Sequence, residues 1–344
     1  MGDTCNFDCL YCDREYIKQD IGSQNLRSDN IDQIDRFFEA VEASQHKIKY
    51  VSFHGGEPML YLKKIDKILD RIHERIERIG AQVAMTTNGS KIEENEWFFA
   101  KWGYNFTITL SYDFRFQELN REAIDLEAVA RISQKYNCQN MFQFVVPTDI
   151  PEAYDATTVA SIIEGCKLVR SNAVNIIPLR HHRGRRKFKV LIDDINLNRF
   201  SYEFMKFIQA LYVHGINVYI DGNYDKVDKS YLENHGKLIL SPDGFIYPEF
   251  DFLEYKRTEF RVGEWKNKIE LYRQGNEDDQ LLDVCKTCEQ RPNCGLKYLY
   301  KMFDETPKGA CVDFYATIDV MVKHLHKLKQ KPSLLHWIGY DDKY

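Results

Sequence analysis

The sequence predicts an α/β fold in which a parallel sheet is covered by helices and is followed by a second, smaller domain. From about residue 30 to residue 180, stretches with helical spacing alternate with short runs of β-branched and aromatic residues. Such repeated alternation is typical of a parallel sheet. From about residue 236 the chain becomes rich in turn signals and cysteines. We therefore place a core domain at residues 1–180, a connecting helical segment at 181–235, a second domain at 236–330 and a C-terminal tail at 331–344.

The elements of the first domain are predicted from the spacing of apolar residues. The clearest helix covers residues 63–79, where one stripe contains Ile65, Ile68, Leu69, Ile72, Ile76 and Ile79. The predicted order is helix 31–43, strand 48–54, helix 63–79, strand 81–89, strand 105–113, helix 126–136, strand 141–146, a helix near 154–168 and strand 173–179. A helix at 200–215, a hairpin around Pro242-Asp243-Gly244 and a helix near 316–330 are predicted to follow.

Composition and charge exclude several classes of protein. The chain has 344 residues, of which 44% are hydrophobic and 29% are charged, as expected of a globular protein with a large core. Its net charge of −5 argues against a general nucleic-acid partner. No apolar run approaches the roughly 18 residues of a membrane span, and the N-terminus lacks the pattern of a secretory signal. We therefore expect no membrane partner and a cytoplasmic location.

The nine cysteines fall into two groups and two single residues. The first group is Cys5, Cys9 and Cys12, and the second is Cys285, Cys288, Cys294 and Cys311. In a reducing compartment, clustered cysteines usually bind metal or carry out redox chemistry. Cys138 and Cys166 stand alone and are expected to be small buried apolar residues.

The first group supplies three thiolates on one short loop. Three thiolates can hold three irons of a [4Fe–4S] cubane and leave the fourth iron free to bind another ligand. A zinc ion is the alternative, but zinc prefers four ligands, and no nearby His or Cys completes such a site. The spacing therefore favours an iron–sulfur cluster and leaves zinc open.

Four motifs in succession resemble the radical S-adenosylmethionine (SAM) superfamily. CNFDCLYC at residues 5–12 resembles the superfamily's cysteine signature, with Tyr11 at the aromatic position. HGGEP (54–58), TTNG (86–89) and SYD (111–113) resemble the segments that end the following strands and line the SAM pocket. The resemblance covers roughly residues 1–180 and implies a partial (β/α)6 barrel. The superfamily's cysteine loop normally follows a first strand, whereas only MGDT precedes Cys5, so we expect either a shortened start or no first strand.

The resemblance also implies roles for individual residues. The glycines of Gly55-Gly56-Glu57-Pro58 would let the backbone approach the bound methionine moiety. Glu57 would accept from its amino group or hold the loop. The other residues expected to bind SAM are Thr87 and Asn88 beside the pocket, Ser111 and Asp113 near the ribose, and Arg121 near the carboxylate.

The second cysteine group could hold zinc or a cluster by its four thiolates alone. Beside the first signature, it resembles the C-terminal SPASM domain of the anaerobic sulfatase-maturase-like group, which binds auxiliary [4Fe–4S] clusters. Tyr298 and Glu249 stand where that domain places cysteines of its inner auxiliary cluster. We therefore expect one auxiliary cluster, held by Cys285, Cys288, Cys294 and Cys311, and two clusters in total. Glu249, Asp251, Glu254 and Glu264 then become candidates for a substrate contact or a base.

The resemblance implies reductive cleavage of SAM to a 5′-deoxyadenosyl radical, with electrons from a flavodoxin or ferredoxin. The leading hypothesis for the substrate is a ribosomally made peptide or a protein, and a small molecule such as a sugar, amino acid or nucleotide is the alternative. A basic segment, RHHRGRRKFK (180–189), could bind an acidic peptide or a phosphate, but an exposed basic loop is the favoured interpretation. A zinc-stapled binding protein is the non-enzymatic alternative.

Overall fold

The structure is a computed structural model. It describes residues 4–9, 11–12, 31–43, 48–146, 154–178, 197–220, 238–247, 261, 263–265, 269–271 and 283–287. The helix predicted near 316–330 and the basic segment at 180–189 lie outside these ranges. The same holds for three of the four acidic candidates, Glu249, Asp251 and Glu254.

The main element is a six-stranded parallel sheet in which each strand pairs with the next one along the chain. The strands are β1 (Tyr50–Phe53), β2 (Gln82–Thr87), β3 (Phe106–Ser111), β4 (Gln139–Val146), β5 (Ala173–Pro178) and β6 (Asn217–Ile220). Because strands in this order run parallel, each connection must cross back over the sheet, and it does so largely through helices. The predicted α/β class and partial (β/α)6 architecture are confirmed.

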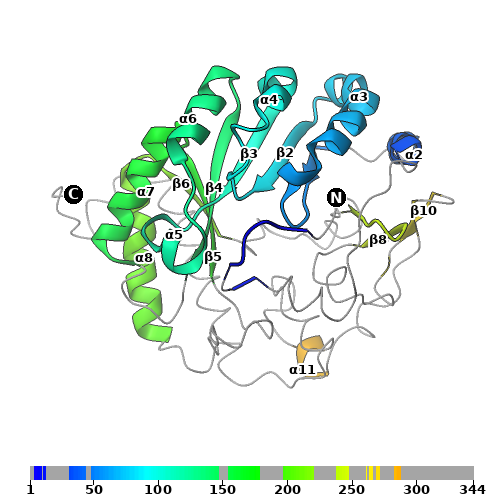
Figure 1. Cartoon of the computed structure of the whole chain (residues 1–344). Coiled ribbons are helices and arrows are strands. Elements are labelled where there is room, and N and C mark those ends of the chain that lie inside the picture. The colour runs from blue at the N-terminus through cyan, green and yellow to red at the C-terminus, as the bar shows by residue number, and fades with distance from the viewer. Residues whose placement is uncertain are drawn as a thin grey trace.

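Helices cover one side of this sheet in an arc (Figure 1). In chain order they are α2 (Ile31–Ala43), α3 (Leu62–Ile79), α4 (Glu96–Trp102), α6 (Leu126–Lys135), α7 (Ala156–Val169) and α8 (Leu197–Val213). The short helix α5 (Gln117–Asn120) lies instead at the lower edge of the sheet in that view. Short 3-10 turns η2 (Pro58–Tyr61), η3 (Gly103–Asn105) and η4 (Phe114–Phe116) lie next to α3, α4 and α5. None of the helices that the structure describes is long and apolar enough to cross a bilayer.

Helix α3 shows how the sequence pattern produces the fold. Five of the six apolar residues in its predicted stripe are buried, with Ile65 and Ile72 completely enclosed. Full burial of an isoleucine contributes about 1.5–3 kcal/mol, so the stripe fixes which face of the helix meets the sheet. Gly80, at φ 67°, ends the helix by taking the left-handed conformation that glycine adopts without strain.

Strand β6 and helix α4 are among the short elements of the main domain that were not predicted from the sequence. Strand β6 lies within the segment assigned as a helical connection, yet it pairs with β5 and extends the parallel sheet. In this four-residue strand Val218 is buried and Tyr219 is half exposed, which is too little periodicity to distinguish a strand from a loop. Helix α4 is similarly short, with seven residues.

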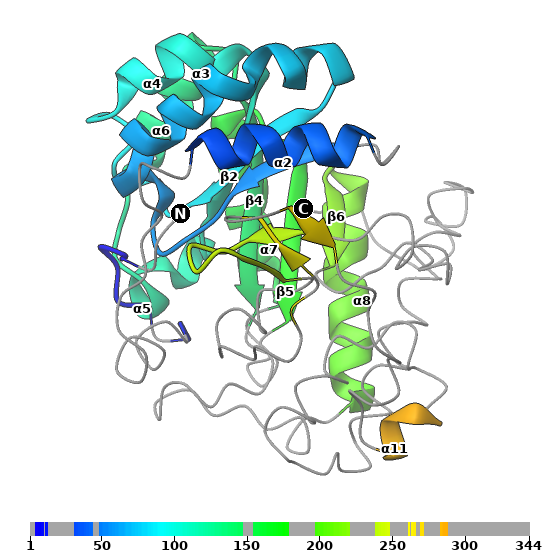
Figure 2. The same ribbon diagram turned by 90° about the vertical axis from the view of Figure 1, so that its right-hand side faces the viewer.

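A second, antiparallel sheet follows in the order β10-β9-β8-β7. Its strands are β7 (Ile239–Leu240), β8 (Phe245–Tyr247), β9 (Gly263–Glu264) and β10 (Glu270–Leu271), and Figure 2 shows β8 and β10 beside helix α2 in that view. The predicted hairpin around Pro242-Asp243-Gly244 is confirmed, since β7 and β8 pair across it. The buried Trp265 donates its indole N–H to the carbonyl of Ser241, 2.8 Å away, and joins the core of the main domain.

Helix α2 is attached to α3 by an arginine that meets three carboxylates. Arg75 lies 3.2 Å from Asp35, 3.2 Å from Glu39 and 2.7 Å from Glu42, and its side chain is only 18% exposed. We expect Arg75→Met to lower the free energy of unfolding by about 1–2 kcal/mol, because several partly buried ion pairs are lost together. In urea titrations the difference should shrink at 1 M NaCl, where screening acts over about 3 Å. A difference that does not change with salt would contradict an electrostatic origin.

Candidate metal centre

The predicted motifs gather at one edge of the parallel sheet. HGGEP (54–58) directly follows β1, Thr87 ends β2 before Asn88, and Ser111 ends β3 before Asp113. The carboxyl ends of parallel strands meet at the same edge, so these loops become neighbours although they are far apart in the sequence. Figure 1 shows the N-terminal cysteine segment running past this edge.

The start of the cysteine loop is attached to the HGGEP turn. The backbone N–H of Glu57 donates to the carbonyl of Thr4 at 2.8 Å, and the N–H of Thr4 donates to the Tyr61 hydroxyl at 3.2 Å. Within the loop, the N–H of Cys12 donates to the carbonyl of Cys9 at 3.1 Å, which forms a tight turn. The loop is therefore held before its first cysteine and turns between its last two.

A second attachment joins the loop to the end of β2. The side-chain amide of Asn88 donates to the Asn6 carbonyl oxygen at 3.0 Å and lies 4.0 Å from the Cys5 sulfur. The Asn6 amide donates to the Ser90 hydroxyl at 2.8 Å. Amide donors directed at a cysteine sulfur stabilise negative charge on it, which is one way that proteins tune an iron–sulfur cluster.

Glu57 holds the motif loops together from inside. It is 1% exposed, and one carboxylate oxygen accepts from the N–H of Met59 at 2.8 Å and from the Thr87 hydroxyl at 2.6 Å. The other oxygen accepts from the N–H of Asn88 at 2.8 Å. Burial raises the pKa of Glu57, and these three donors act against that rise. Of the two roles expected for Glu57, holding the loop is the one seen here, and the contact with SAM stays a prediction.

The TTNG motif needs its glycine. Gly89 has φ 77°, and a Cβ atom there would lie 2.6 Å from the Leu110 side chain on β3. Both the backbone conformation and the lack of space exclude a larger residue. The turn that places Asn88 beside the cysteine loop therefore depends on this glycine.

A third attachment joins the loop to the end of β3. The Tyr11 hydroxyl donates to a carboxylate oxygen of Asp113 at 2.6 Å. Asp113 is fully buried, and it also accepts from the N–H of Val145 and the amide of Asn120, each at 3.4 Å. Burial raises the pKa of Asp113, while Arg121 and these donors lower it. The predicted ribose contact of Asp113 stays a prediction.

Arg121 lies between the cysteine loop and the end of β3. Its side chain is 10% exposed, and its guanidinium donates to the carbonyl of Ser111 and lies 5.6 Å from the centre of the Tyr11 ring. Burial raises the pKa of the Cys9 thiol, and the charge and hydrogen bond of Arg121 oppose that rise. The predicted Arg121 thus meets the cysteine loop directly.

Two buried polar atoms beside these groups have no hydrogen-bond partner among the described residues. They are the amide oxygen of Asn120 and Nε of Arg121, which forms an ion pair with Asp113 at 3.9 Å but no hydrogen bond. Buried polar atoms are normally satisfied, so an unpaired donor and acceptor at one place fit a site that receives a polar ligand. Sequence analysis did not select Asn120, because an asparagine in a four-residue helix carries no motif signal.

The thiols match an iron–sulfur cluster in number and type. Cys9 is buried and Cys5 and Cys12 are half-buried, and none of the three forms a disulfide with another described residue. In the described part of the chain, no three His, Cys, Asp or Glu side chains are gathered closely enough to hold a metal ion. The number and type of the donors fit a [4Fe–4S] cluster, and the zinc alternative is decided by metal analysis.

The second cysteine group is described only at Cys285. This residue is buried in the short helix α11 (Asp283–Lys286), whereas Cys288, Cys294 and Cys311 lie outside the described residues. Tyr298 lies outside them as well. The auxiliary cluster therefore stays a prediction.

The two single cysteines are part of the apolar interior. Cys166 is 2% exposed and Cys138 is half-buried against the core, and burial raises the pKa of each thiol to about 12. At pH 8 only about one thiol in ten thousand would be ionised, so we expect iodoacetamide to modify both at least about a hundredfold more slowly in native protein than in urea. Peptide mapping by mass spectrometry measures this. Rapid labelling of native Cys166 would contradict its place in the core.

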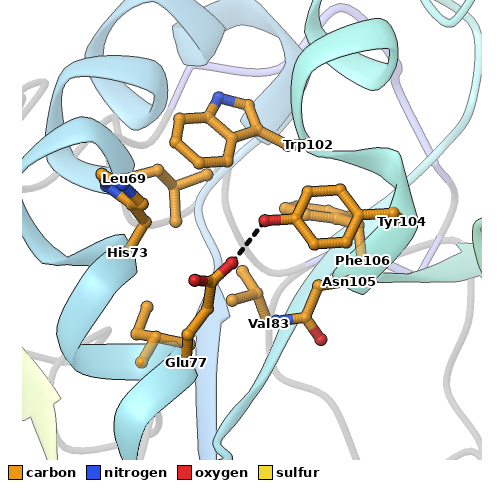
Figure 3. Close-up of a pocket in the computed structure, with 9 residues that line it drawn as sticks. Leu69, His73, Glu77, Val83, Trp102, Tyr104, Asn105 and Phe106 are labelled. Atoms are coloured by element: carbon orange, nitrogen blue, oxygen red, sulfur yellow. Dashed lines mark hydrogen bonds between the residues drawn. The ribbon is translucent and has the colours of Figure 1, made fainter.

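A cavity exists elsewhere in the molecule and is not the candidate site. It lies between α3 and the amino ends of β2 and β3, and Figure 3 shows Tyr104 directed toward Glu77 at its rim. Its volume is about 20 Å³, enough for a water molecule or so and too small for a substrate. It is far from the motif loops because it adjoins the opposite ends of the strands.

Comparison with known proteins agrees with this geometry. Residues 1–113 match the family model described as the Radical SAM superfamily. A curated relative, the radical SAM cyclopropyl synthase TigE of Paramaledivibacter caminithermalis, is 25% identical over 123 residues, which are 33% of this chain. The match spans only 26% of that protein's length.

Solved structures resemble the whole fold. Native anSMEcpe with bound AdoMet superposes with a TM-score of 0.62 at 18% identity, covering 93% of this chain and 96% of that one. SuiB of Streptococcus suis, bound to the precursor peptide SuiA, gives a TM-score of 0.63 at 16% identity, covering 89% and 73% of the two chains. At such identities the likeness shows a shared fold, a six-stranded parallel sheet with a small antiparallel sheet after it.

Proposed function

We propose that this chain, a member of the radical SAM superfamily, cleaves SAM reductively and uses the resulting 5′-deoxyadenosyl radical to modify a peptide or protein. One observation carries the proposal. A loop with three thiols is attached to the carboxyl ends of β1, β2 and β3, each through residues of a different motif. Chance β–α turns would not place four matching motifs on one edge of one sheet in the right order.

A [4Fe–4S] cluster held by Cys5, Cys9 and Cys12 would supply the electron that splits the sulfonium of SAM. When bound, the cluster would pass one electron from a flavodoxin or ferredoxin to SAM, which would give methionine and a 5′-deoxyadenosyl radical able to take a hydrogen atom from a substrate C–H bond.

The chain's own residues bind and orient SAM. Arg121 would bind the carboxylate, since a guanidinium recognises that group well. Its buried Nε makes no hydrogen bond among the described residues, which supports this role, and it lies 3.9 Å from the Asp113 carboxylate. The half-buried Gly55 and Gly56 let backbone groups approach the methionine moiety. The buried Thr87 and Asn88 border the loop, and Ser111 closes the same edge near the ribose.

A peptide or protein substrate is supported by the proteins that share this fold. Their structures contain peptides, SuiA in SuiB and Cp18Cys in anSMEcpe. The Asp243 hairpin places a small sheet after the barrel, as in those folds.

The experiment is anaerobic incubation with SAM and reductant, with and without candidate peptides encoded near this chain. We expect 5′-deoxyadenosine in every arm and a mass change in one peptide. Absence of 5′-deoxyadenosine in all arms would refute the proposal.

We further propose that Cys285, Cys288, Cys294 and Cys311 hold a second [4Fe–4S] cluster. Anaerobically reconstituted protein should then contain about eight irons and eight sulfides per chain. A Cys285→Ala protein should contain about four, and it should retain the loop that binds SAM. About twelve irons in the parent protein would refute the count, and zinc without iron would favour the binding-protein alternative.

A further inference from the structure

The described residues attach Tyr11 to the protein core at two points. Its hydroxyl donates to Asp113 at 2.6 Å, across 102 positions of sequence. The guanidinium of Arg121 lies 5.6 Å from the centre of its ring, within the range of a cation–π contact. Tyr11 stands between Cys9 and Cys12, so fixing this side chain also restricts the part of the loop that carries both thiols.

Asp113 is well suited to be the fixed end of this contact. It is 0% exposed, and its backbone N–H donates to the side chain of Gln117 at 2.9 Å. The following residue, Phe114, has φ 51°, a left-handed conformation that a bulky residue rarely adopts. Strain of this kind persists only when the surroundings impose it, and it occurs mainly at functional sites.

Packing explains how Phe114 is held. Its ring lies 4.9 Å from that of Phe142 and 5.4 Å from that of Phe144, centre to centre. A Cβ atom on Gly165 of α7 would lie 3.0 Å from the Phe114 ring, a tight contact that shows how closely α7 packs against this ring. The turn that presents Asp113 is therefore locked from behind by β4 and α7.

We propose that Asp113 is a positioning residue that holds the Tyr11 hydroxyl and thereby fixes the Cys9–Cys12 part of the loop before any cofactor binds. This deepens the proposed function and rests on it for the role of the thiols. A loop already held in place loses less conformational freedom when its cysteines bind a cluster, and it sets the cluster's surroundings more reproducibly. Asp113 thus acts through Tyr11, rather than through the ribose contact that the family resemblance implies.

A double-mutant cycle tests the coupling. Tyr11→Phe removes only the hydroxyl. Asp113→Asn removes the charge and replaces one of the two acceptor oxygens with an amide donor, so it weakens the contact with Tyr11 without changing the shape of the side chain. In apoprotein, we expect each variant to speed amide exchange in residues 5–12 by about tenfold, a typical effect of losing one buried hydrogen bond to a charged group. The effect of the double variant should be smaller than the sum of the two single effects, because both changes act on the same contact. Additive effects, or unchanged exchange, would overturn the proposal.

A matched control pair exists at the other end of the sheet. The Tyr104 hydroxyl donates to a carboxylate oxygen of Glu77 at 2.5 Å, and both residues border the cavity in Figure 3. Tyr104→Phe and Glu77→Gln make the same chemical changes, but they should leave exchange in residues 5–12 unchanged. Faster exchange there in the control variants would show general destabilisation and would overturn a specific role for Asp113.

Two measurements on reconstituted protein separate positioning from other roles. The midpoint potential of the cluster should shift in the same direction in Tyr11→Phe and in Asp113→Asn. The affinity for SAM should change by the same small amount in the two variants. A loss of SAM affinity in Asp113→Asn alone would instead assign Asp113 to SAM binding, either directly or through Arg121, whose Nε lies 3.9 Å from its carboxylate, and would overturn the proposal. If the parent protein holds only zinc, the proposed function fails, yet exchange in the apoprotein still decides whether Asp113 holds the loop. If Asp113→Asn does not fold, Tyr11→Phe alone decides through exchange and potential.

Discussion

A Cys9→Ala protein is expected to lose reductive cleavage of SAM completely. Cys9 is the buried member of the three thiols. Its thiol also interacts with Arg121, through the charge of the guanidinium and through a hydrogen bond. With two thiolates left, the loop cannot hold three irons of a cubane, so no iron remains positioned to bind SAM. Chromatography of anaerobic reactions should show 5′-deoxyadenosine at the background of the reaction without protein. Iron should fall from about eight to about four atoms per chain.

Cys166→Ala is the matched control for this prediction. Cys166 is also a buried thiol, but it lies in α7 and packs in the core. Its loss should lower stability modestly and leave iron content and 5′-deoxyadenosine formation unchanged. If Cys9→Ala cleaved SAM at the parent rate, the assignment of the first cysteine group would be wrong.

Removal of the Glu57 carboxylate is expected to be among the most destabilising single changes at the site. In Glu57→Ala, the N–H groups of Met59 and Asn88 and the Thr87 hydroxyl all lose their acceptor. Each unsatisfied buried donor costs about 1–3 kcal/mol, and partial rearrangement of the loops reduces the sum. We therefore expect the free energy of unfolding to fall by about 3–5 kcal/mol. Urea titration of the apoprotein measures this without any contribution from bound metal.

Two variants separate the hydrogen bonds of Glu57 from the general effect of losing a glutamate. Glu57→Gln keeps one acceptor oxygen but directs an amide donor toward one of the three N–H or O–H groups. Its free energy of unfolding should therefore lie between those of the parent protein and Glu57→Ala. Glu74→Ala removes an exposed glutamate from α3 and should leave stability near the parent value. Equal stability of Glu57→Ala and Glu74→Ala would contradict the role of Glu57 as the centre of the motif loops.

Much of the fold follows from local patterns in the sequence. Helix α3 was predicted as 63–79 and covers Leu62–Ile79, and the strands that became β2, β3 and β5 were each predicted with boundaries within a few residues. These elements have long or strongly apolar patterns, so burial decides their conformation wherever they pack. The short strand β6 was missed because its conformation is decided by its partner β5.

The candidate site was predicted residue by residue but not in its contacts. The cysteine spacing and the HGGEP, TTNG and SYD motifs are properties of the chain itself, and the parallel sheet explains why they meet. The sequence does not show that Glu57 bonds to Thr87 and Asn88, 30 and 31 positions away. Nor does it select Asn120, whose only signal is a buried and unpaired amide oxygen.

The sequence by itself determined which groups this protein brings to its site: three closely spaced thiols and the turns that follow three strands. Only the tertiary structure decided which of those groups hold one another, as Asp113 holds Tyr11 and Glu57 holds the loop after β2. The physical reason is that residue type and spacing are local properties. Burial and hydrogen-bond partners depend on segments that meet only after the sheet has formed.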